Sequence, residues 1–170
     1  GIAFNKKEYY DYIKSGKWSK TTNVVTSGDI ELVIHETTDQ GTEFPKEGVV
    51  VLPGDIVSKQ VSVENVSEHP FYLRVKLVYG INSDILSEEE CFKLNIDEEN
   101  WKYEDGWYYY QGVVEPGEET PYVFSKVEII GDKVDNNYIG KTLSINVIAH
   151  AVQAENNVIT DNDVSTAQGW

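Results

Sequence analysis

The stretch FYLRVKLVY, residues 71–79, sets Phe71, Leu73, Val75, Leu77 and Tyr79 against Tyr72, Arg74, Lys76 and Val78. A period of two is typical of a β-strand that buries one face and leaves the other wet. The same pattern predicts strands in DIELVIHE (29–36), IVSKQVSVENV (56–66) and KTLSINVIAHAVQA (141–154). YVFSKVEII (122–130), FKLNI (92–96) and WYYYQG (107–112) are further predicted strands. The sequence therefore predicts an all-β protein.

Sequences typical of turns separate these strands. The turn sequences are Leu52-Pro53-Gly54-Asp55, Glu115-Pro116-Gly117-Glu118, Gly131-Asp132, Asp135-Asn136-Asn137 and Glu155-Asn156-Asn157. Short strands with this punctuation predict a β-sandwich with jelly-roll or Greek-key connections. The segment 83–92 is predicted as one short helix, with Ser87 as its cap and Glu90 at the capping-box position. In the strand 56–66, a slip of the pattern at Lys59 predicts a β-bulge.

The chain is expected to form one domain, residues 21–156, with a different segment at each end. Residues 1–20 are predicted to be an extended N-terminal arm, and residues 157–170 a polar C-terminal tail that ends in Trp170. Neither segment has a clear partner in the core pattern. Because the chain contains no Met, we expect Gly1 to come from processing or from cloning.

Composition excludes several classes of partner. The 170 residues carry a formal net charge of −15, which argues against nucleic acid and against electrostatic attachment to an anionic membrane. No apolar run is long enough to span a bilayer, so we expect no membrane insertion of the mature chain. Cys91 is the only cysteine; it excludes an intrachain disulfide and is expected to be a small core residue.

Motifs for catalysis or metal binding are absent from the sequence. The three histidines, His35, His69 and His150, are far apart, and no zincin motif, nucleophile elbow or phosphate loop is present. Asp161-Asn162-Asp163 matches part of a calcium loop but lacks its Gly and its distant Glu, so a solvated acidic face is expected, with weak Ca²⁺ binding as the alternative. Asn65-Val66-Ser67 is a short glycosylation-type sequon. We expect no catalytic residues, no metal and no cofactor.

Four consecutive aromatic residues, Trp107, Tyr108, Tyr109 and Tyr110, allow two interpretations. As a strand, the run points Trp107 and Tyr109 one way and Tyr108 and Tyr110 the other, so that one pair packs in the core and the other covers a sheet face or a subunit contact. Alternatively, the run is an exposed ligand platform together with the neighbouring Trp101 and Tyr103. Aromatic strand propensity favours the first interpretation.

Four blocks, in order, resemble the TasA/camelysin family of secreted Gram-positive proteins, whose signal peptides are cleaved by a SipW-type peptidase. The blocks are TTNVVTSGDIELVIHE (21–36), VVLPGDIVSKQVSVENVSEHPFYLRVKL (50–77), DGWYYYQGVVEPGEETPYVFSKVEI (105–129) and YIGKTLSINVIAHAVQAEN (138–156). The resemblance implies a jelly-roll-like sandwich in the extracellular matrix or on the cell surface. It also implies fibres in which the N-terminal segment of one subunit completes the sheet of the next. Residues 1–20 depart from the pattern, being longer and richer in Lys than the family's leader.

The resemblance makes the N-terminal arm a candidate donor strand. An open sheet edge presents unpaired N–H and C=O groups to another chain, and an extended arm can dock on it with alternate side chains in pockets. The donor residues would be Ile2, Ala3, Phe4, Tyr9, Tyr10, Tyr12 and Ile13. The alternatives are an ordinary intrachain edge strand and a disordered tail.

The sequence therefore predicts a non-enzymatic structural subunit that is secreted and polymerises head-to-tail with itself, with accessory or anchoring matrix proteins as further partners. The alternative is a monomeric cell-surface binding module that uses its aromatic residues on glycans or proteins. The third is a metalloprotease, as the camelysin label suggests, although no metal-ligand constellation supports it.

Overall fold

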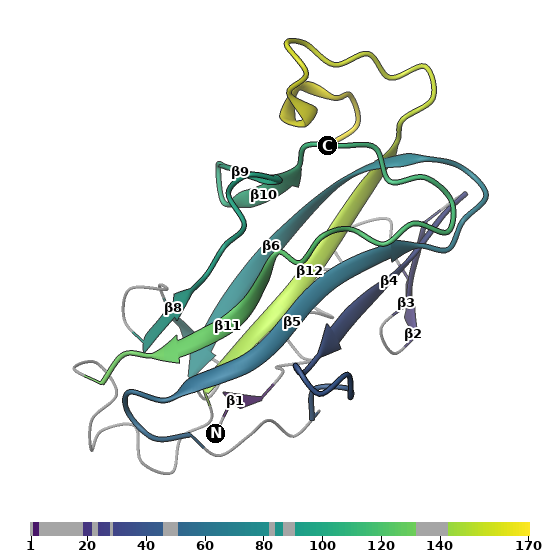
Figure 1. Ribbon diagram of the computed structural model, residues 1–170. Helices are drawn as coiled ribbons and strands as arrows, with labels where there is room; N and C mark the ends of the chain where they lie inside the picture. Colours follow the sequence, from purple (N-terminus) through teal and green to yellow (C-terminus); the bar gives the residue numbers. More distant parts are fainter. Residues whose placement is uncertain are drawn as a thin grey trace.

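The computed structural model describes residues 2–3, 19–21, 24–27, 29–45, 51–81, 84–86, 91–131 and 143–170. This part of the chain is all-β, as the sequence predicts, and its strands form two six-stranded sheets. Apart from the parallel pair of β1 with β12, neighbouring strands are antiparallel. The two sheets form a sandwich-like body (Figure 1).

The first sheet has the order β1-β12-β6-β10-β9, and β7 also pairs with β6. Its strands are β1 (Ile2–Ala3), β12 (Leu143–Gln153), β6 (Phe71–Ile81), β7 (Asp84–Leu86), β10 (Trp107–Tyr110) and β9 (Trp101–Glu104). The second sheet has the order β2-β3-β4-β5-β11-β8. Its strands are β2 (Ser19–Thr21), β3 (Val24–Ser27), β4 (Ile30–Thr37), β5 (Ile56–Asn65), β11 (Phe124–Ile129) and β8 (Phe92–Leu94).

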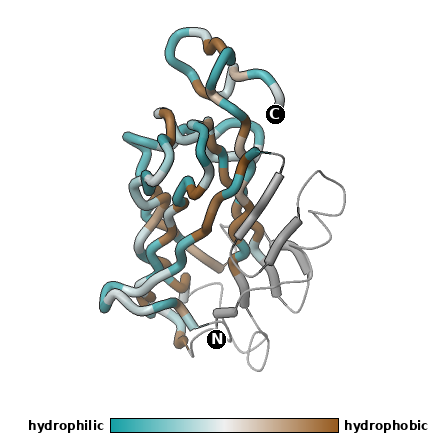
Figure 2. Tube along the Cα trace, turned by 90° about the vertical axis from the view of Figure 1, so that its right-hand side faces the viewer, coloured by the Kyte–Doolittle hydropathy of each residue, from teal (hydrophilic) through white to brown (hydrophobic). Residues whose placement is uncertain are grey.

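The core lies between the sheets and follows the alternation of the strands. In β4, for example, Ile30, Leu32 and Ile34 are buried while the residues between them are more exposed. In the first sheet, β12 pairs with β6 along all eleven of its residues, which aligns the inward-facing side chains of the two strands. Burial of these apolar faces is the main driving force for such a fold. Figure 2 shows the hydrophobic stretches, in brown, along the strands of the body.

The β9–β10 hairpin is built by its two-residue turn. Asp105 and Gly106 have φ angles of 50° and 89°, the left-handed region that a type I′ hairpin turn requires. Asp-Gly is among the favoured pairs for this turn, because glycine has no Cβ to clash there. The turn sets Trp107 opposite Glu104 and Tyr110 opposite Trp101.

Two local expectations have different outcomes. Residues 84–86 form β7, paired with Tyr79–Ile81, so the predicted helix over 83–92 is wrong for this part. Pairing with a long neighbouring strand overrides the weak helix preference of three residues. Residues 87–90, which include Ser87 and Glu90, lie outside the described residues.

The bulge predicted at Lys59 is confirmed. Phe124 of β11 pairs with Val61, whereas Lys126 pairs with Ser58, so a two-residue step on β11 faces a three-residue step on β5. Lys59 lies inside this irregular step. Its side chain nevertheless points into the core, where it is fully buried.

The C-terminal segment, residues 155–170, folds back over the first sheet. It contains a short 3-10 helix, η2 (Val164–Thr166), and Val164 and Ala167 are buried. Gly169 lies against the Val152 side chain of β12. The expectation that this segment has no partner is therefore wrong. The outward face of β6, β10 and β12 carries enough apolar surface to hold it.

Candidate functional site

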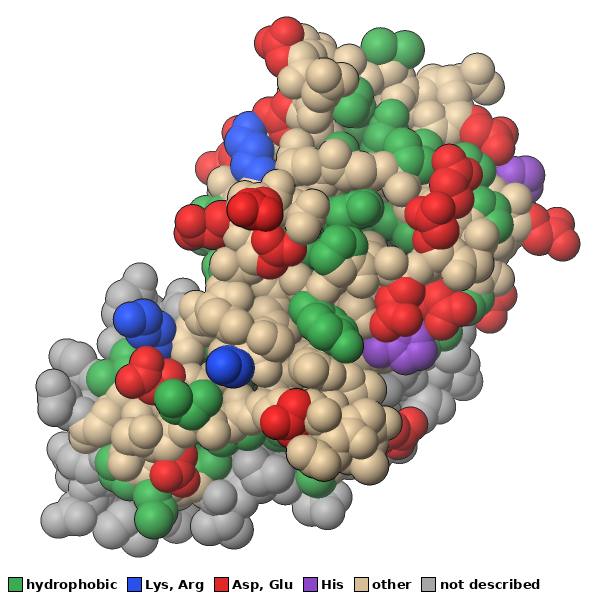
Figure 3. Space-filling model, in the orientation of Figure 1, with side chains coloured by type: hydrophobic (Ala, Val, Ile, Leu, Met, Phe, Trp, Pro, Cys, Tyr) green, Lys and Arg blue, Asp and Glu red, His purple; other side chains and the backbone are tan. Residues whose placement is uncertain are grey.

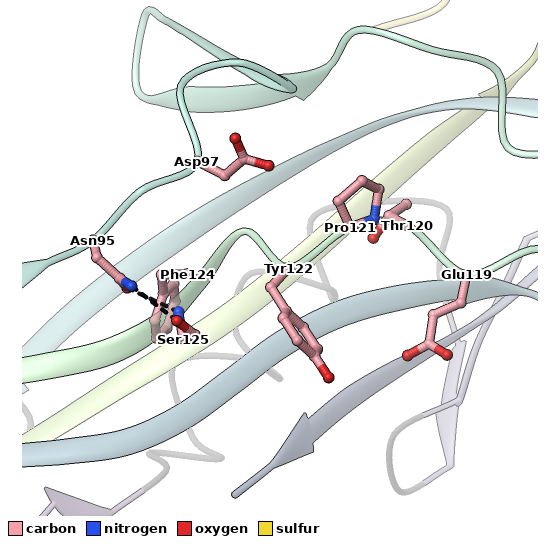
Figure 4. Close-up of a pocket in the computed structure, with 8 residues that line it drawn as sticks. All are labelled: Asn95, Asp97, Glu119, Thr120, Pro121, Tyr122, Phe124 and Ser125. Atoms are coloured by element: carbon pink, nitrogen blue, oxygen red, sulfur yellow. Dashed lines mark hydrogen bonds between the residues drawn. The ribbon is translucent and has the colours of Figure 1, made fainter. Parts of the chain in front are cut away.

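A groove of about 560 Å³ lies on the second sheet, between the loop that follows β8 and the segment that leads into β11. Its lining is Asn95, Asp97, Glu119, Thr120, Pro121, Tyr122, Phe124 and Ser125. Figure 4 shows Tyr122 between the two acidic residues, with Asn95 bonded to Ser125 at one end. We call this the β11 groove.

One wall of the groove is an irregular extension of β11 along β5. The Pro116-Gly117 turn directs the chain onto β5, where the N–H of Gly117 donates to Asn65 and the N–H of Asn65 donates to Glu118. The N–H of Thr120 then donates to Val63. The extension therefore occupies a strand position in the sheet without regular strand geometry.

The other wall is held by Asn95 and Asp97. The Asn95 Oδ1 accepts from the main-chain N–H groups of Ser125 and Lys126, at 2.9 and 2.8 Å. The N–H of Asp97 donates to the carbonyl of Val123. β8 pairs only with residues 127–129 of β11. Beyond the end of β8, the Asn95 side chain and the Asp97 main-chain N–H form the hydrogen bonds at this edge of β11.

Beyond Val123 the edge of the extension is bare. Within the described part of the chain, the N–H groups of Glu119 and Tyr122 form no hydrogen bond, and Pro121 has no N–H to offer. The Tyr122 side chain is 45% exposed. An edge with open main-chain groups and an exposed aromatic ring is the kind of surface on which an extended peptide can add as a strand.

The electrostatics of the groove are acidic. Asp97 accepts from the N–H of Glu99 and from Asn100 Nδ2, and Glu119 accepts from Ser62 Oγ. None of these donors is a cation. In the described part of the chain, neither carboxylate forms an ion pair.

A second cluster lies on the outward face of the first sheet, around Arg74. Its guanidinium carbon is 4.0 Å from the centre of the Trp107 ring and 4.9 Å from that of Trp170. His150 Nδ1 accepts from Arg74 Nε at 3.1 Å and from its Nη2 at 2.9 Å, while Nη1 donates to the Tyr109 hydroxyl. This cluster packs the end of the chain onto the sheet through cation–π contacts.

The same segment is held at a second point by Lys102 and Asp163. Their side chains form an ion pair, which raises the pKa of Lys102 and lowers that of Asp163. Asp163 also caps η2 by accepting from Ser165. The carboxylate of Asp163, part of the calcium-like tripeptide, is thus engaged with the protein itself.

Lys59 is the most unusual titratable group. It is fully buried; its Nζ donates to the carbonyl of Ile145 across the sandwich at 3.2 Å and lies 3.9 Å from a Glu36 oxygen. Its Nζ is also 5.2 Å from the centre of the Phe44 ring. Burial lowers the pKa of Lys59 to about 7, with Glu36 opposing the shift.

The structure brings together only some of the residues that the sequence singled out. Ile2 and Ala3 form β1, in register with Leu143 and Ser144 of the same chain. The other donor candidates, Phe4, Tyr9, Tyr10, Tyr12 and Ile13, lie outside the described residues.

The alternation predicted for the aromatic run is confirmed. Trp107 and Tyr109 face outward and are 7% and 6% exposed, whereas Tyr108 and Tyr110 are partly buried on the other side. Trp107 and Tyr109 are therefore not surface aromatics, because the C-terminal segment and Arg74 cover them. Tyr103 is the exposed member, at 61%, and its ring lies 4.9 Å from that of Tyr108.

The three histidines lie in separate places. His35 contacts Glu64, His69 contacts Glu155, and His150 contacts Arg74. Among the side chains that the structure describes, no group of three His, Cys, Asp or Glu residues is arranged to hold a metal ion. Cys91 is buried, as predicted.

The sequon at Asn65 has a structural role. Asn65 is fully buried, and its amide donates to the carbonyls of His69 and Val114. Its Oδ1 accepts from the N–H and hydroxyl of Ser67. A side chain used in this way holds the β5–β6 turn and is not accessible for attachment of a glycan.

The sequence offered partial signals for the groove and none for its bare edge. The Pro-Gly turn and the acidic residues before Trp101 are visible in the sequence, but their meeting across β11 depends on the order of the strands.

No described helix has the length and apolar character needed to cross a membrane. No protein-family model matches the chain, and no curated protein matches it significantly.

Proposed function

We propose that this protein is a secreted structural subunit of fibres in a biofilm matrix or on a Gram-positive cell surface, and that it polymerises head-to-tail through its N-terminal arm. The proposal rests on the resemblance to the TasA/camelysin family together with one structural observation. That observation is the short strand pairing of β1 with the first sheet. The chain itself is the main partner, with accessory or anchoring matrix proteins as further partners.

Among the described residues, β1 pairs with β12 through two residue pairs, Ile2 with Leu143 and Ala3 with Ser144. A main-chain hydrogen bond contributes about 1 kcal/mol net to stability, so these two pairs by themselves hold β1 weakly. The N-terminal residues are thus able to take part in a sheet and are easily released from their own. Both properties are needed in a segment that is donated to a neighbouring subunit.

The chain path supports the finer jelly-roll or Greek-key assignment. Successive strands change sheets: β5 lies in the second sheet, β6 in the first, β8 in the second, β9 and β10 in the first, β11 in the second and β12 in the first. Repeated crossing between two antiparallel sheets is the usual path of jelly-roll and Greek-key sandwiches.

The proposal is tested by placing charge on the apolar face of the arm. In the variant Ile2→Asp/Phe4→Asp, two carboxylates replace alternate apolar side chains, and we expect loss of sedimentable polymers because a docked strand would bury these positions. The matched variant Ala3→Asp/Asn5→Asp adds the same charge at the intervening positions and should still polymerise. Equal polymerisation of the two variants would reject a donor strand with this face.

A binding module remains the second candidate, and the exposed ring of Tyr103, in contact with the partly buried ring of Tyr108, is the observation that favours it. An exposed aromatic ring of this kind can hold a glycan or a protein side chain. Addition of a glycan that the monomer binds should change the intrinsic fluorescence, and Tyr103→Ala should abolish the change. No response across a broad glycan panel would count against this function.

A further inference from the structure

We propose that the β11 groove is the acceptor for the N-terminal arm of a second copy of this chain. This inference rests on the proposed polymerisation and adds the place where the arm docks. The arm would lie along the bare edge between Glu119 and Tyr122 and would extend the second sheet by one strand. Three features of the groove support this occupant: its main-chain edge, its charge and its exposed aromatic ring.

The main-chain edge sets the kind of partner. Asn95 and Asp97 occupy the edge next to residues 123–126, and the N–H groups of Glu119 and Tyr122 beyond them form no hydrogen bond in the described chain. Other edges are less suitable. β8 has three residues, and the edge strand β9 carries the ion-paired Lys102 and Glu104. Charges and short strands are devices that block strand addition. The groove edge also carries a charge, Glu119, and Pro121, but its charge is of the sign that attracts a basic segment.

The charge of the groove selects a basic partner. The segments that form its walls, residues 95–100 and 115–125, contain six acidic residues and no Lys or Arg. None of these carboxylates forms an ion pair within the described chain. Figure 3 shows acidic side chains, in red, spread over this face of the molecule.

The N-terminal arm has the complementary charge. Residues 1–20 contain five lysines and only two acidic residues, in a protein with a net charge of −15. A basic segment next to unpaired carboxylates gains attraction and is steered toward the groove during encounter. The arm also carries Phe4, Tyr9, Tyr10 and Tyr12 among these lysines. Such side chains can pack on the exposed ring of Tyr122.

Within its own subunit the arm is anchored away from the groove. Both ends of the arm are held elsewhere in their own subunit, by β1 on the first sheet and by β2 at the outer edge of the second. β2 and β11 are separated by β3, β4 and β5, a distance of about 19 Å at about 4.8 Å per strand. A released arm of eighteen residues reaches about 60 Å when extended, which is enough to meet a neighbouring molecule.

The donor arm and the acceptor groove lie on different surfaces of one molecule. The N-terminus lies at the lower end of the body in Figure 1, and β11 lies on the front sheet. An arm that leaves one surface and docks on a different surface of the next molecule makes a heterologous contact. Such a contact repeats without closing, which produces a filament.

Crosslinking between two full-length variants tests the acceptor. One preparation carries Tyr10→Cys in the arm, and the other carries Tyr122→Cys in the groove; native Cys91 is buried and does not compete. After mixing under assembly conditions and mild oxidation, we expect a disulfide-linked heterodimer. The control replaces Tyr122→Cys by Tyr103→Cys, another exposed tyrosine. Docking raises the local thiol concentration into the millimolar range, so the groove should give at least about tenfold more heterodimer than the control.

A charge variant adds a second readout. Glu119→Lys in the Tyr122→Cys chain should reduce the heterodimer, whereas Glu43→Lys, at an exposed carboxylate outside both wall segments, should leave it unchanged. Assembly is followed in parallel by sedimentation. If the mixture sediments as polymers but the Tyr122→Cys and Tyr103→Cys chains crosslink equally, the acceptor is wrong and the polymerisation stands. If neither polymers nor heterodimers form, both proposals are rejected.

Discussion

At the residue scale, Lys59 stands out because a lysine is almost never fully buried without a partner. It bridges the sheets through the carbonyl of Ile145 and lies close to Glu36. Lys59 lies between Val57 and Val61 in the two-residue period of β5, which is a core position. Because it is charged, the sequence predicts a β-bulge there and not a buried side chain. The structure contains both the irregularity and the inward lysine. The sequence does not show which buried carbonyl will accept a hydrogen bond from the lysine.

The burial of Lys59 predicts a pH dependence of stability. Its pKa is about 7 in the folded protein and 10.5 ordinarily, so between these values the unfolded chain binds more protons than the folded one. The free energy of unfolding should therefore rise as the pH increases from about 7 to about 10. Below about 7 this group adds no further pH dependence, because the lysine is protonated in both states.

The variant Lys59→Met isolates this effect. It removes the buried charge while keeping an apolar side chain of similar length, so it should be more stable than the wild type at pH 7, and the difference should shrink toward pH 10. Urea unfolding at several pH values measures both quantities. Lys93→Met, on an exposed side chain of β8, is the control. A difference between wild type and Lys59→Met that does not change with pH would contradict the account.

At the element scale, the C-terminal segment is the largest departure from the sequence prediction. Its apolar residues follow no period, so no strand or helix pattern marks it. A signal for its docking site was present elsewhere: Ile148 and Val152 lie on the outward face of β12, and both are buried. A strand that is apolar on both faces is typical of one covered on both sides. What covers it depends on tertiary packing, which the local sequence does not specify.

Trp170 should anchor this segment. It stacks on Arg74, contacts the rings of Tyr109 and His150, and donates from Nε1 to the carbonyl of Val164. We expect Trp170→Ala to lower the free energy of unfolding by about 1–3 kcal/mol, from lost burial and cation–π contact. Near-ultraviolet circular dichroism should change as well, because Trp170 itself is lost and the ring of Tyr109 loses a neighbour.

Val158→Ala is the matched control for Trp170→Ala. Val158 lies in the same segment but is 85% exposed, so its truncation should have little effect on the free energy of unfolding. Equal losses for the two variants would show that the segment is held by something other than the ring of Trp170.

The strands themselves were predictable to different degrees. β4, β5, β6, β11 and β12 follow clear two-residue periods, and their predicted ranges agree with the structure within a few residues. β9 was missed because Trp101–Glu104 is too short for a period, and β7 was assigned as helix. The β11 groove could not be predicted, because its two walls come from segments about twenty residues apart that meet only through the order of the strands.

At the scale of the whole molecule, the described structure is a sandwich-like body with a two-residue strand, β1, near the N-terminus, an acidic groove and a covered outer face. An all-β class and an acidic surface follow from composition and alternation. Assembly does not follow from either, because it depends on which edge is left bare. The central claim is our proposal that the basic arm of one molecule docks on the bare acidic edge of another.

Deletion of residues 1–12 tests that claim most directly. The truncated chain loses β1 and part of the lysine-rich arm, and it keeps the body, whose remaining strands pair without them. We predict that electron microscopy shows filaments for the full chain and none for the truncated chain, which should sediment as a monomer with an unchanged far-ultraviolet circular dichroism spectrum. Filaments formed by a folded protein that lacks residues 1–12 would contradict the account.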